Sequence, residues 1–111
     1  CIAQHGITGT PLQLVGRFAE YGIRKGNVGT LWQNVAHETL PKELMEKMKA
    51  WSKETGKDIK FTTRQFKKEI DSVPKNFKEK CAELAYKEAK DFILAFRAKG
   101  SASLVADRLA L

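Results

Sequence analysis

Apolar residues recur at three- and four-residue steps along most of the chain, which is the spacing of one face of an α-helix. The longest such pattern lies between Pro74 and Gly100. Pro74 suits a first helical turn, where no N–H is needed, and Gly100 suits a left-handed C-terminal cap. We therefore predict a long central helix over about residues 74–99, whose wide apolar face is formed by Phe77, Cys81, Leu84, Ala85, Ala89, Phe92, Ala95 and Phe96.

Three shorter helices are predicted before residue 57 from the same spacing and from their end signals. Thr10-Pro11 is a good start for a first helix, which should run to about residues 21–24. Thr30 can cap a second helix, which ends at Pro41 because the residue before a proline is pushed out of the helical conformation. Pro41 can also open a third helix, which closes at Gly56.

A fourth helix is predicted from Thr62 to about Ser72. Thr62 and Gln65 have the spacing of a capping box, and the phenylalanines at 61 and 66 have that of a hydrophobic staple. After the long helix, Ser101 or Ser103 can cap a short last helix with an apolar face formed by Leu104, Val105, Leu109 and Leu111.

No segment alternates apolar and polar residues with period two, so no strand is expected. The fold class predicted is all-α, a compact bundle of about six helices. Residues 1–10 lack periodicity and are interpreted as an N-terminal loop or tether, and residues 11–111 as a single helical domain, since 111 residues suit one domain. Because the chain begins with Cys1 rather than Met, we expect this domain to be part of a larger parent protein.

The two cysteines, Cys1 and Cys81, make neither a disulfide framework nor a metal cluster, and they fit a reducing, cytoplasmic setting. No apolar run approaches the length of a membrane span, and no motif for a cofactor or a metal is present. The net charge of +7 favours an anionic partner, which could be nucleic acid, an acidic protein or a membrane surface.

The most basic window is residues 57–80, with eight Lys or Arg residues and four Asp or Glu residues. Its order of helix, short turn and helix over residues 62–80 loosely resembles a helix-turn-helix, in which the second helix enters the major groove and nearby lysines hold phosphate. The pattern departs at Lys67, where a small residue is usual, and at Asp71, where glycine is usual. The alternative is a solvated face. The phosphate-binding candidates are Lys60, Arg64, Lys67, Lys68, Lys75 and Lys78.

A second candidate is the segment Arg24-Lys25-Gly26-Asn27-Val28-Gly29. Glycines let backbone amides approach a phosphate, and the start of the following helix adds a partial positive charge. The basic Gly-x-x-Gly is similar to the nucleic-acid clamp of KH domains, but that fold needs flanking strands, and none is predicted. An ordinary turn between helices is the alternative. Arg24 and Lys25 are kept as a second phosphate contact.

His5, His37 and Glu38 are the only residues that suggest an enzyme, a metal-free ribonuclease. Nothing in the sequence brings them together, so no catalytic residue is assigned. Five aromatic residues fall on apolar faces and are assigned to the core, namely Trp32, Trp51, Phe18, Phe92 and Phe96. Tyr21 and Tyr86 are the candidates for exposure. The predicted function is non-catalytic nucleic-acid binding through a basic face. A protein-interaction module and a small ribonuclease or toxin domain remain the alternatives.

Overall fold

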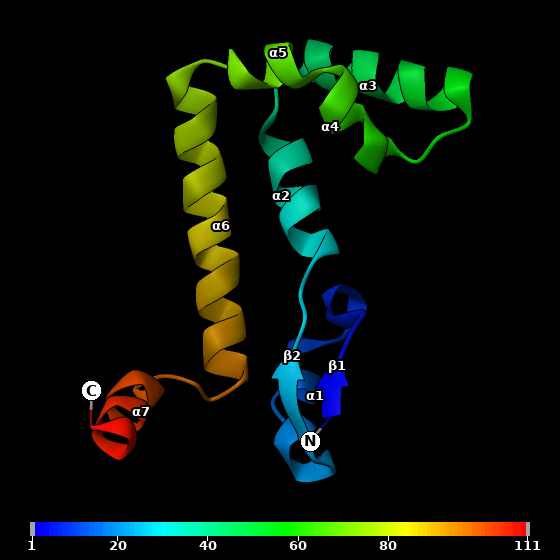
Figure 1. The fold of residues 1–111 in the computed structure, drawn as a ribbon. Coiled ribbons are helices and arrows are strands. Elements are labelled where there is room, and N and C mark those ends of the chain that lie inside the picture. The colour runs from blue at the N-terminus through cyan, green and yellow to red at the C-terminus, as the bar shows by residue number, and fades with distance from the viewer. Residues whose placement is uncertain (1, 111) are drawn as a thin grey trace. The chain divides into compact units, whose positions relative to one another are not determined.

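The computed structural model describes residues 2–110, so Cys1 and Leu111 lie outside the described residues. This part contains seven α-helices and two short strands, which confirms the all-α class (Figure 1). Each of the six predicted helices has a counterpart, and the fourth is divided into two. The helices are α1 (Leu12–Val15), α2 (Thr30–Thr39), α3 (Lys42–Thr55), α4 (Thr62–Gln65), α5 (Lys67–Asp71), α6 (Lys75–Ala95) and α7 (Ser101–Leu109).

The contacts of the chain divide it into two compact units. The internal unit is residues 30–85, and the terminal unit combines residues 1–29 with residues 86–111. Helix α6 contributes its first half to the internal unit and its second half to the terminal unit. The single domain expected for residues 11–111 stays a prediction.

The core of the internal unit is built from side chains of its helices and of the turns between them. Leu44 and Met48 of α3 and Val73 of the turn after α5 are buried, and Met48 has no exposed surface. Helix α3 lies beside α4 and α5 (Figure 1). The half-buried residues that pack against this core are Leu40, Met45, Phe66, Ile70 and Phe77. The predicted third helix is confirmed, since Pro41 precedes α3 and Gly56 ends it with a φ of 64°.

The predicted fourth helix is interrupted at Phe66, whose φ of −103° and ψ of 25° separate α4 from α5. The capping box predicted at Thr62 is wrong. A 3-10 turn, η3 (Ile59–Phe61), runs directly into α4, so Thr62 has a helical conformation rather than the extended one of an N-cap. Its side chain is fully buried, and its hydroxyl donates a hydrogen bond to the Ile59 carbonyl oxygen at 2.5 Å.

The terminal unit contains the two strands that the sequence pattern did not predict. Strands β1 (Ile2–Gln4) and β2 (Ile23–Gly26) pair in parallel (Figure 1). A 3-10 turn, η1 (Ile7–Gly9), follows β1 and buries Ile7 completely. The expectation of a loop over residues 1–10 and of no strand is therefore wrong. Strands of three and four residues are too short to show an alternating pattern, and their partner lies about twenty residues away.

Aromatic packing and close backbone contact hold the terminal unit together. Val15 and Phe92 are buried, and the ring of Phe96 lies 6.2 Å from that of Phe18, edge to face. A Cβ atom added to Gly26 would lie 2.5 Å from Phe96 Cζ and 2.7 Å from Ile7 Cδ1. Only a residue without a side chain fits there.

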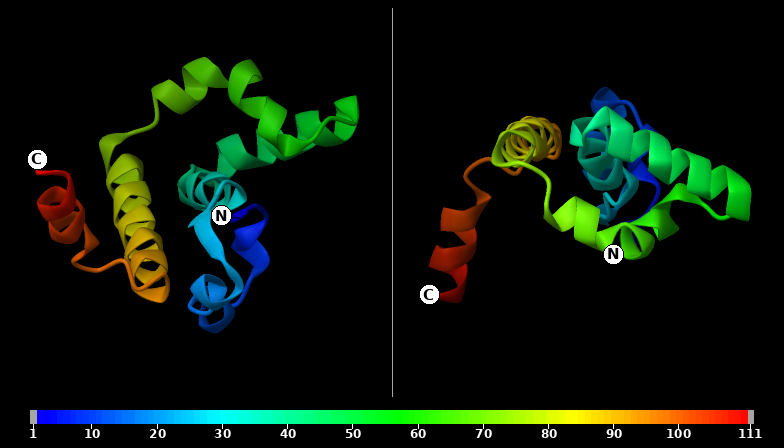
Figure 2. Two further views of the ribbon diagram at one scale, coloured as in Figure 1. Left: turned by 60° about the horizontal axis from the view of Figure 1, so that its bottom comes forward. Right: turned by 90° about the horizontal axis from the view of Figure 1, so that it is seen from above.

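The first and last helical predictions differ from the structure at their ends. The predicted helix over residues 11 to 21–24 is a one-turn helix, α1, followed by a separate 3-10 turn, η2 (Phe18–Tyr21). Helix α6 ends at Ala95 rather than near residue 99, and Arg97 has a φ of 56°. Helix α7 follows through a short connection (Figure 2) and has no buried residue. Among residues 2–110, no helix combines the length and the apolar character needed to cross a membrane.

Candidate functional site

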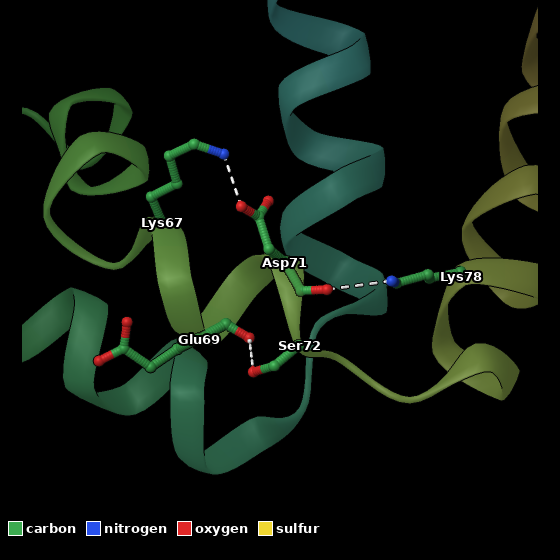
Figure 3. Close-up of polar contacts among 5 residues, drawn as sticks. All are labelled: Lys67, Glu69, Asp71, Ser72 and Lys78. Atoms are coloured by element: carbon green, nitrogen blue, oxygen red, sulfur yellow. Dashed lines mark hydrogen bonds and ion pairs between the residues drawn. The ribbon is translucent and has the colours of Figure 1, made fainter.

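The helix-turn-helix order predicted over residues 62–80 is present in the internal unit. Helix α5 ends at Asp71, and α6 begins at Lys75. The two residues that depart from the usual pattern pair with each other, because Lys67 Nζ lies 2.5 Å from the Asp71 carboxylate (Figure 3). Lys78 donates a hydrogen bond to the Asp71 carbonyl oxygen at 3.1 Å. Asp71 therefore joins α5 to the start of α6.

Three of the predicted phosphate-binding lysines thus have polar partners already. Besides Lys67 and Lys78, Lys75 forms an ion pair of 3.4 Å with Glu79 on the same helix. These side chains are exposed, and an exposed ion pair contributes only about 0–1 kcal/mol, so an incoming phosphate can compete for the ammonium groups. Lys68 is exposed and forms no ion pair with any residue that the structure describes.

Two other predicted residues, Lys60 and Arg64, line one open hollow of about 580 Å³ in the internal unit. We call it the basic hollow, and its lining residues are Trp51, Lys57, Lys60, Phe61, Thr63, Arg64 and Gln65. Three cationic side chains and two aromatic rings therefore face one concave surface. No acidic residue is part of this lining.

Local hydrogen bonds shape the backbone that carries the hollow. Gly56 ends α3 in the left-handed conformation, which lets the chain turn back toward Trp51. Ser52 Oγ then donates a hydrogen bond to the Lys57 carbonyl oxygen at 2.6 Å. Asp58 accepts one from the Lys60 backbone N–H at 2.9 Å and starts η3. These two hydrogen bonds therefore hold the backbone from Lys57 to Lys60 in place beside the hollow.

The aromatic rings of the hollow are in contact with its lysines. Lys57 Nζ lies 5.7 Å from the centre of the Trp51 ring, and Lys60 Nζ lies 5.4 Å from the centre of the Phe61 ring. These distances are those of cation–π contacts. Phe61 is 55% exposed, although phenylalanine is among the residue types that are most often buried. Each aromatic ring of the hollow thus lies beside a positive charge, and the ring of Phe61 is the more exposed of the two.

The sequence pattern does not identify Trp51 and Phe61 as members of this site, and it includes Lys57 in the basic window without assigning it a phosphate contact. Trp51 shares the apolar stripe of α3, which predicts a core position, and the spacing of Phe61 predicts a hydrophobic staple. The available signal is a single aromatic residue, Phe61, with Lys57 and Lys60 before it and Arg64 after it. The predicted exposure of Tyr21 and Tyr86 is confirmed, at 64% and 71%, whereas the assignment of Trp32 to the core is wrong, because this residue is 38% exposed.

The glycine-rich segment after η2 is not an ordinary turn between helices, because Arg24, Lys25 and Gly26 belong to β2. Both basic side chains are exposed. The Asn27 backbone N–H donates to the Gln4 carbonyl oxygen at 2.9 Å and so is not available to a phosphate. Gly26 is needed for its fit against Phe96 and Ile7. Arg24 and Lys25 remain proposed phosphate contacts, without a backbone cradle beside them.

The two histidines have different surroundings. His5 is exposed, and its Nε2 lies 3.3 Å from the Asn27 side-chain amide. His37 Nε2 is buried without a hydrogen-bond partner, and burial lowers the pKa of His37 below its usual value of 6.5. Because Nε2 is closed to a substrate, this geometry does not support a ribonuclease that transfers a proton through that atom of His37. No group of three or more His, Cys, Asp or Glu residues within 2–110 is arranged to hold a metal ion.

No protein-family model matches this chain, and searches of curated proteins and of solved structures give no significant match.

Proposed function

We propose that this protein is a non-catalytic nucleic-acid-binding domain and that the basic hollow is its main contact. The observation that supports this proposal is the meeting of Lys57, Lys60 and Arg64 on one concave surface without an acidic lining residue. Nucleic acid supplies closely spaced phosphates, and their neutralisation by Lys and Arg is the main source of binding free energy in such complexes. The half-buried Cys81 thiol is free, which fits the proposed cytoplasmic setting.

The two kinds of cationic side chain in the hollow bind phosphate in different ways. The guanidinium of Arg64 can bind two phosphate oxygens at once, whereas the lysines act as point charges on flexible stems. Lys67 and Lys68 follow on α5 and extend the positive surface beyond the hollow, and Lys75 and Lys78 do so on the first turn of α6. We assign Arg24 and Lys25 of the terminal unit to a second, weaker contact.

The test is fluorescence anisotropy of labelled single-stranded RNA, single-stranded DNA and duplex DNA, titrated with the protein from about 50 to 300 mM salt. The observed affinity should fall linearly on a double-logarithmic plot. In the double variant Lys60→Glu/Arg64→Glu, the affinity at low salt should fall about tenfold or more. The slope should also become shallower by about 1.4, because two phosphate contacts of a single strand are lost.

A matched control keeps the same change in net charge. Lys42 and Lys49 are exposed residues of α3, and at 100° per residue both lie on the side opposite Trp51. Lys42→Glu/Lys49→Glu should therefore change the affinity by less than about threefold, through the general field alone. Equal losses in the two double variants would show that only net charge matters. Absence of binding by every strand at low salt would reject the proposal.

One observation favours a protein-interaction module as the second candidate. In the terminal unit, Tyr86, Ile93 and Leu94 line an apolar hollow of about 400 Å³ on the second half of α6. Helix α7 exposes further apolar side chains, Leu104, Val105 and Leu109, each by more than half. If nucleic acid fails to bind, this surface becomes the site to test, with Ile93→Lys as the variant that should abolish capture of a protein partner.

A further inference from the structure

We propose that the basic hollow accepts an unpaired nucleobase, so that the ligand of this protein is single-stranded nucleic acid. This inference rests on the proposed function and goes beyond it by naming the strand state of the ligand. It is based on the two aromatic rings of the hollow rather than on its charges. A site for phosphate alone would need the lysines and Arg64, but not Trp51 and Phe61.

The positions of the two rings support base stacking. Trp51 comes from the last turns of α3 and is half-buried, so packing holds its indole in place. Phe61 ends η3 and is 55% exposed, so its ring is accessible from solvent. The two rings line the same hollow, whose volume is within the range that holds small molecules. A base that enters it meets an aromatic face without displacing core side chains.

Stacking of a base on Trp51 or Phe61 should be stronger than the cation–π contact that each ring makes with a lysine. At exposed sites a cation–π contact is worth about a two- to fivefold change in an equilibrium constant. Stacking of one base on an aromatic side chain is worth about five- to 150-fold. A base can therefore replace the ammonium group over the ring of Trp51 or Phe61. Lys57 or Lys60 is then free to reach the phosphate that is attached to that base.

The polar groups at the rim suit a base of any identity. The Thr63 hydroxyl donates to the Lys60 carbonyl oxygen at 3.1 Å, so its oxygen remains an acceptor. The exposed Gln65 amide has both donors and acceptors. A flexible amide and a hydroxyl can satisfy several base edges. We therefore expect weak sequence preference, as is usual where stacking rather than hydrogen bonding carries the affinity.

A duplex should bind less well to this site. Its bases are stacked on one another inside the double helix, and the aromatic rings of the hollow cannot reach their faces unless a base is flipped out at a cost. The phosphates of a duplex remain available to Lys60 and Arg64. The proposal therefore predicts that a duplex binds weakly and with a strong dependence on salt. A single strand should bind more tightly, because stacking adds a contribution to the affinity that does not weaken as salt is raised.

The experiment follows the fluorescence of Trp51 in a Trp32→Phe background, where it is the only tryptophan. The ligands are ten-nucleotide oligothymidylate, oligouridylate, a DNA duplex of equal phosphate number and an abasic strand that carries the phosphates without bases. Polyglutamate serves as an anion without phosphates. Both single strands should quench Trp51 and bind about tenfold more tightly than the abasic strand. The RNA and DNA arms show which sugar is preferred.

Two variants test the rings separately. Phe61→Leu removes an exposed ring and should lower the affinity for oligothymidylate about tenfold, with the salt slope unchanged, since no phosphate contact is lost. Trp51→Leu should have a similar effect. Because Trp51 is half-buried, Phe61→Leu keeps the test decisive even if that second variant does not fold.

The outcomes separate this inference from the proposed function. If the abasic strand or the duplex binds as tightly as oligothymidylate and Trp51 is not quenched, the stacking proposal is wrong while nucleic-acid binding stands. If no strand binds at low salt, or if polyglutamate binds as tightly as oligothymidylate, both are rejected. Quenching by both single strands together with loss of affinity in Phe61→Leu supports both.

Discussion

The two units of this protein pack their cores in opposite ways. In the internal unit, side chains from helices and from the turns between them fill the interior, with Leu44, Met48 and Val73 at its centre. In the terminal unit, small residues let backbone and rings approach closely, as Gly26 does against Phe96. A Cβ on Gly16 would likewise lie 3.2 Å from the Ala95 carbonyl oxygen. The internal unit should therefore be sensitive to the loss of atoms, and the terminal unit to their addition.

The largest loss of stability is expected when a buried side chain of the internal unit is shortened. Met48→Ala removes a side chain with no exposed surface from the middle of the core and leaves a cavity. The free energy of unfolding should fall by about 3 kcal/mol, as measured by urea denaturation followed by circular dichroism. Lys49→Ala changes the neighbouring exposed residue and should cost less than about 0.5 kcal/mol. Similar values for the two variants would mean that Met48 is not at the centre of this core.

The next largest loss of stability is expected when a tightly packed glycine of the terminal unit is given a side chain. Gly26→Ala adds one methyl group that must displace the Phe96 ring and the fully buried Ile7 side chain. The unfolding free energy should fall by about 2 kcal/mol. Gly29→Ala is the matched control, because its Cβ would meet no atom within 4 Å and should cost nothing measurable. If both glycines tolerate alanine equally, the contrast between the two cores is wrong.

A smaller effect is expected where the basic hollow depends on a local hydrogen bond. Asp58→Ala removes the carboxylate that accepts from the Lys60 N–H and should cost about 1 kcal/mol. Asp58→Asn keeps an acceptor oxygen and should retain most of the stability. Denaturation and oligothymidylate titration of the same two variants check whether this turn shapes the hollow. Unchanged stability and affinity in Asp58→Ala would show that it does not.

The smallest effect concerns His37 and should appear only on acidification. Because burial lowers the pKa of His37 in the folded state, folding favours its neutral form. Its contribution is complete above the unfolded value of about 6.5 and is lost as the pH falls below it, because the unfolded chain then binds the proton more readily. The loss of stability between pH 7.5 and pH 5.5 should thus be smaller in His37→Gln than in the unmodified protein. An identical loss in both would contradict this sign.

The sequence predicted the parts of the fold that depend on neighbours along the chain. Pro41 and Gly56 act on their own segment, so they marked the ends of α3 correctly. Every residue of the predicted apolar face of α6 is buried or half-buried, and Phe92 is the most enclosed. Fine breaks were missed, such as the one at Phe66, because the same apolar spacing continues across it.

Pairing between strands that lie far apart in the chain could not be predicted from local sequence patterns. Strands β1 and β2 are three and four residues long and stabilise each other only when distant segments meet. The candidate site was predicted only in part, because it too depends on segments that are separated along the chain. Lys60 and Arg64 belong to a basic window that is visible in the sequence, whereas Trp51 reaches the hollow only because the chain reverses at Gly56. An apolar stripe on a helix does not show which of its aromatic residues lies at the edge of the core.

The tight fit of Gly26 also sets a rule for how this protein can diverge. A descendant that acquires a side chain at position 26 must lose volume at position 7 or position 96 to keep the same packing. Substitutions at these three sites should therefore arise together rather than singly. Such linked changes offer a signature for recognising distant homologues in which the rest of the terminal unit has drifted.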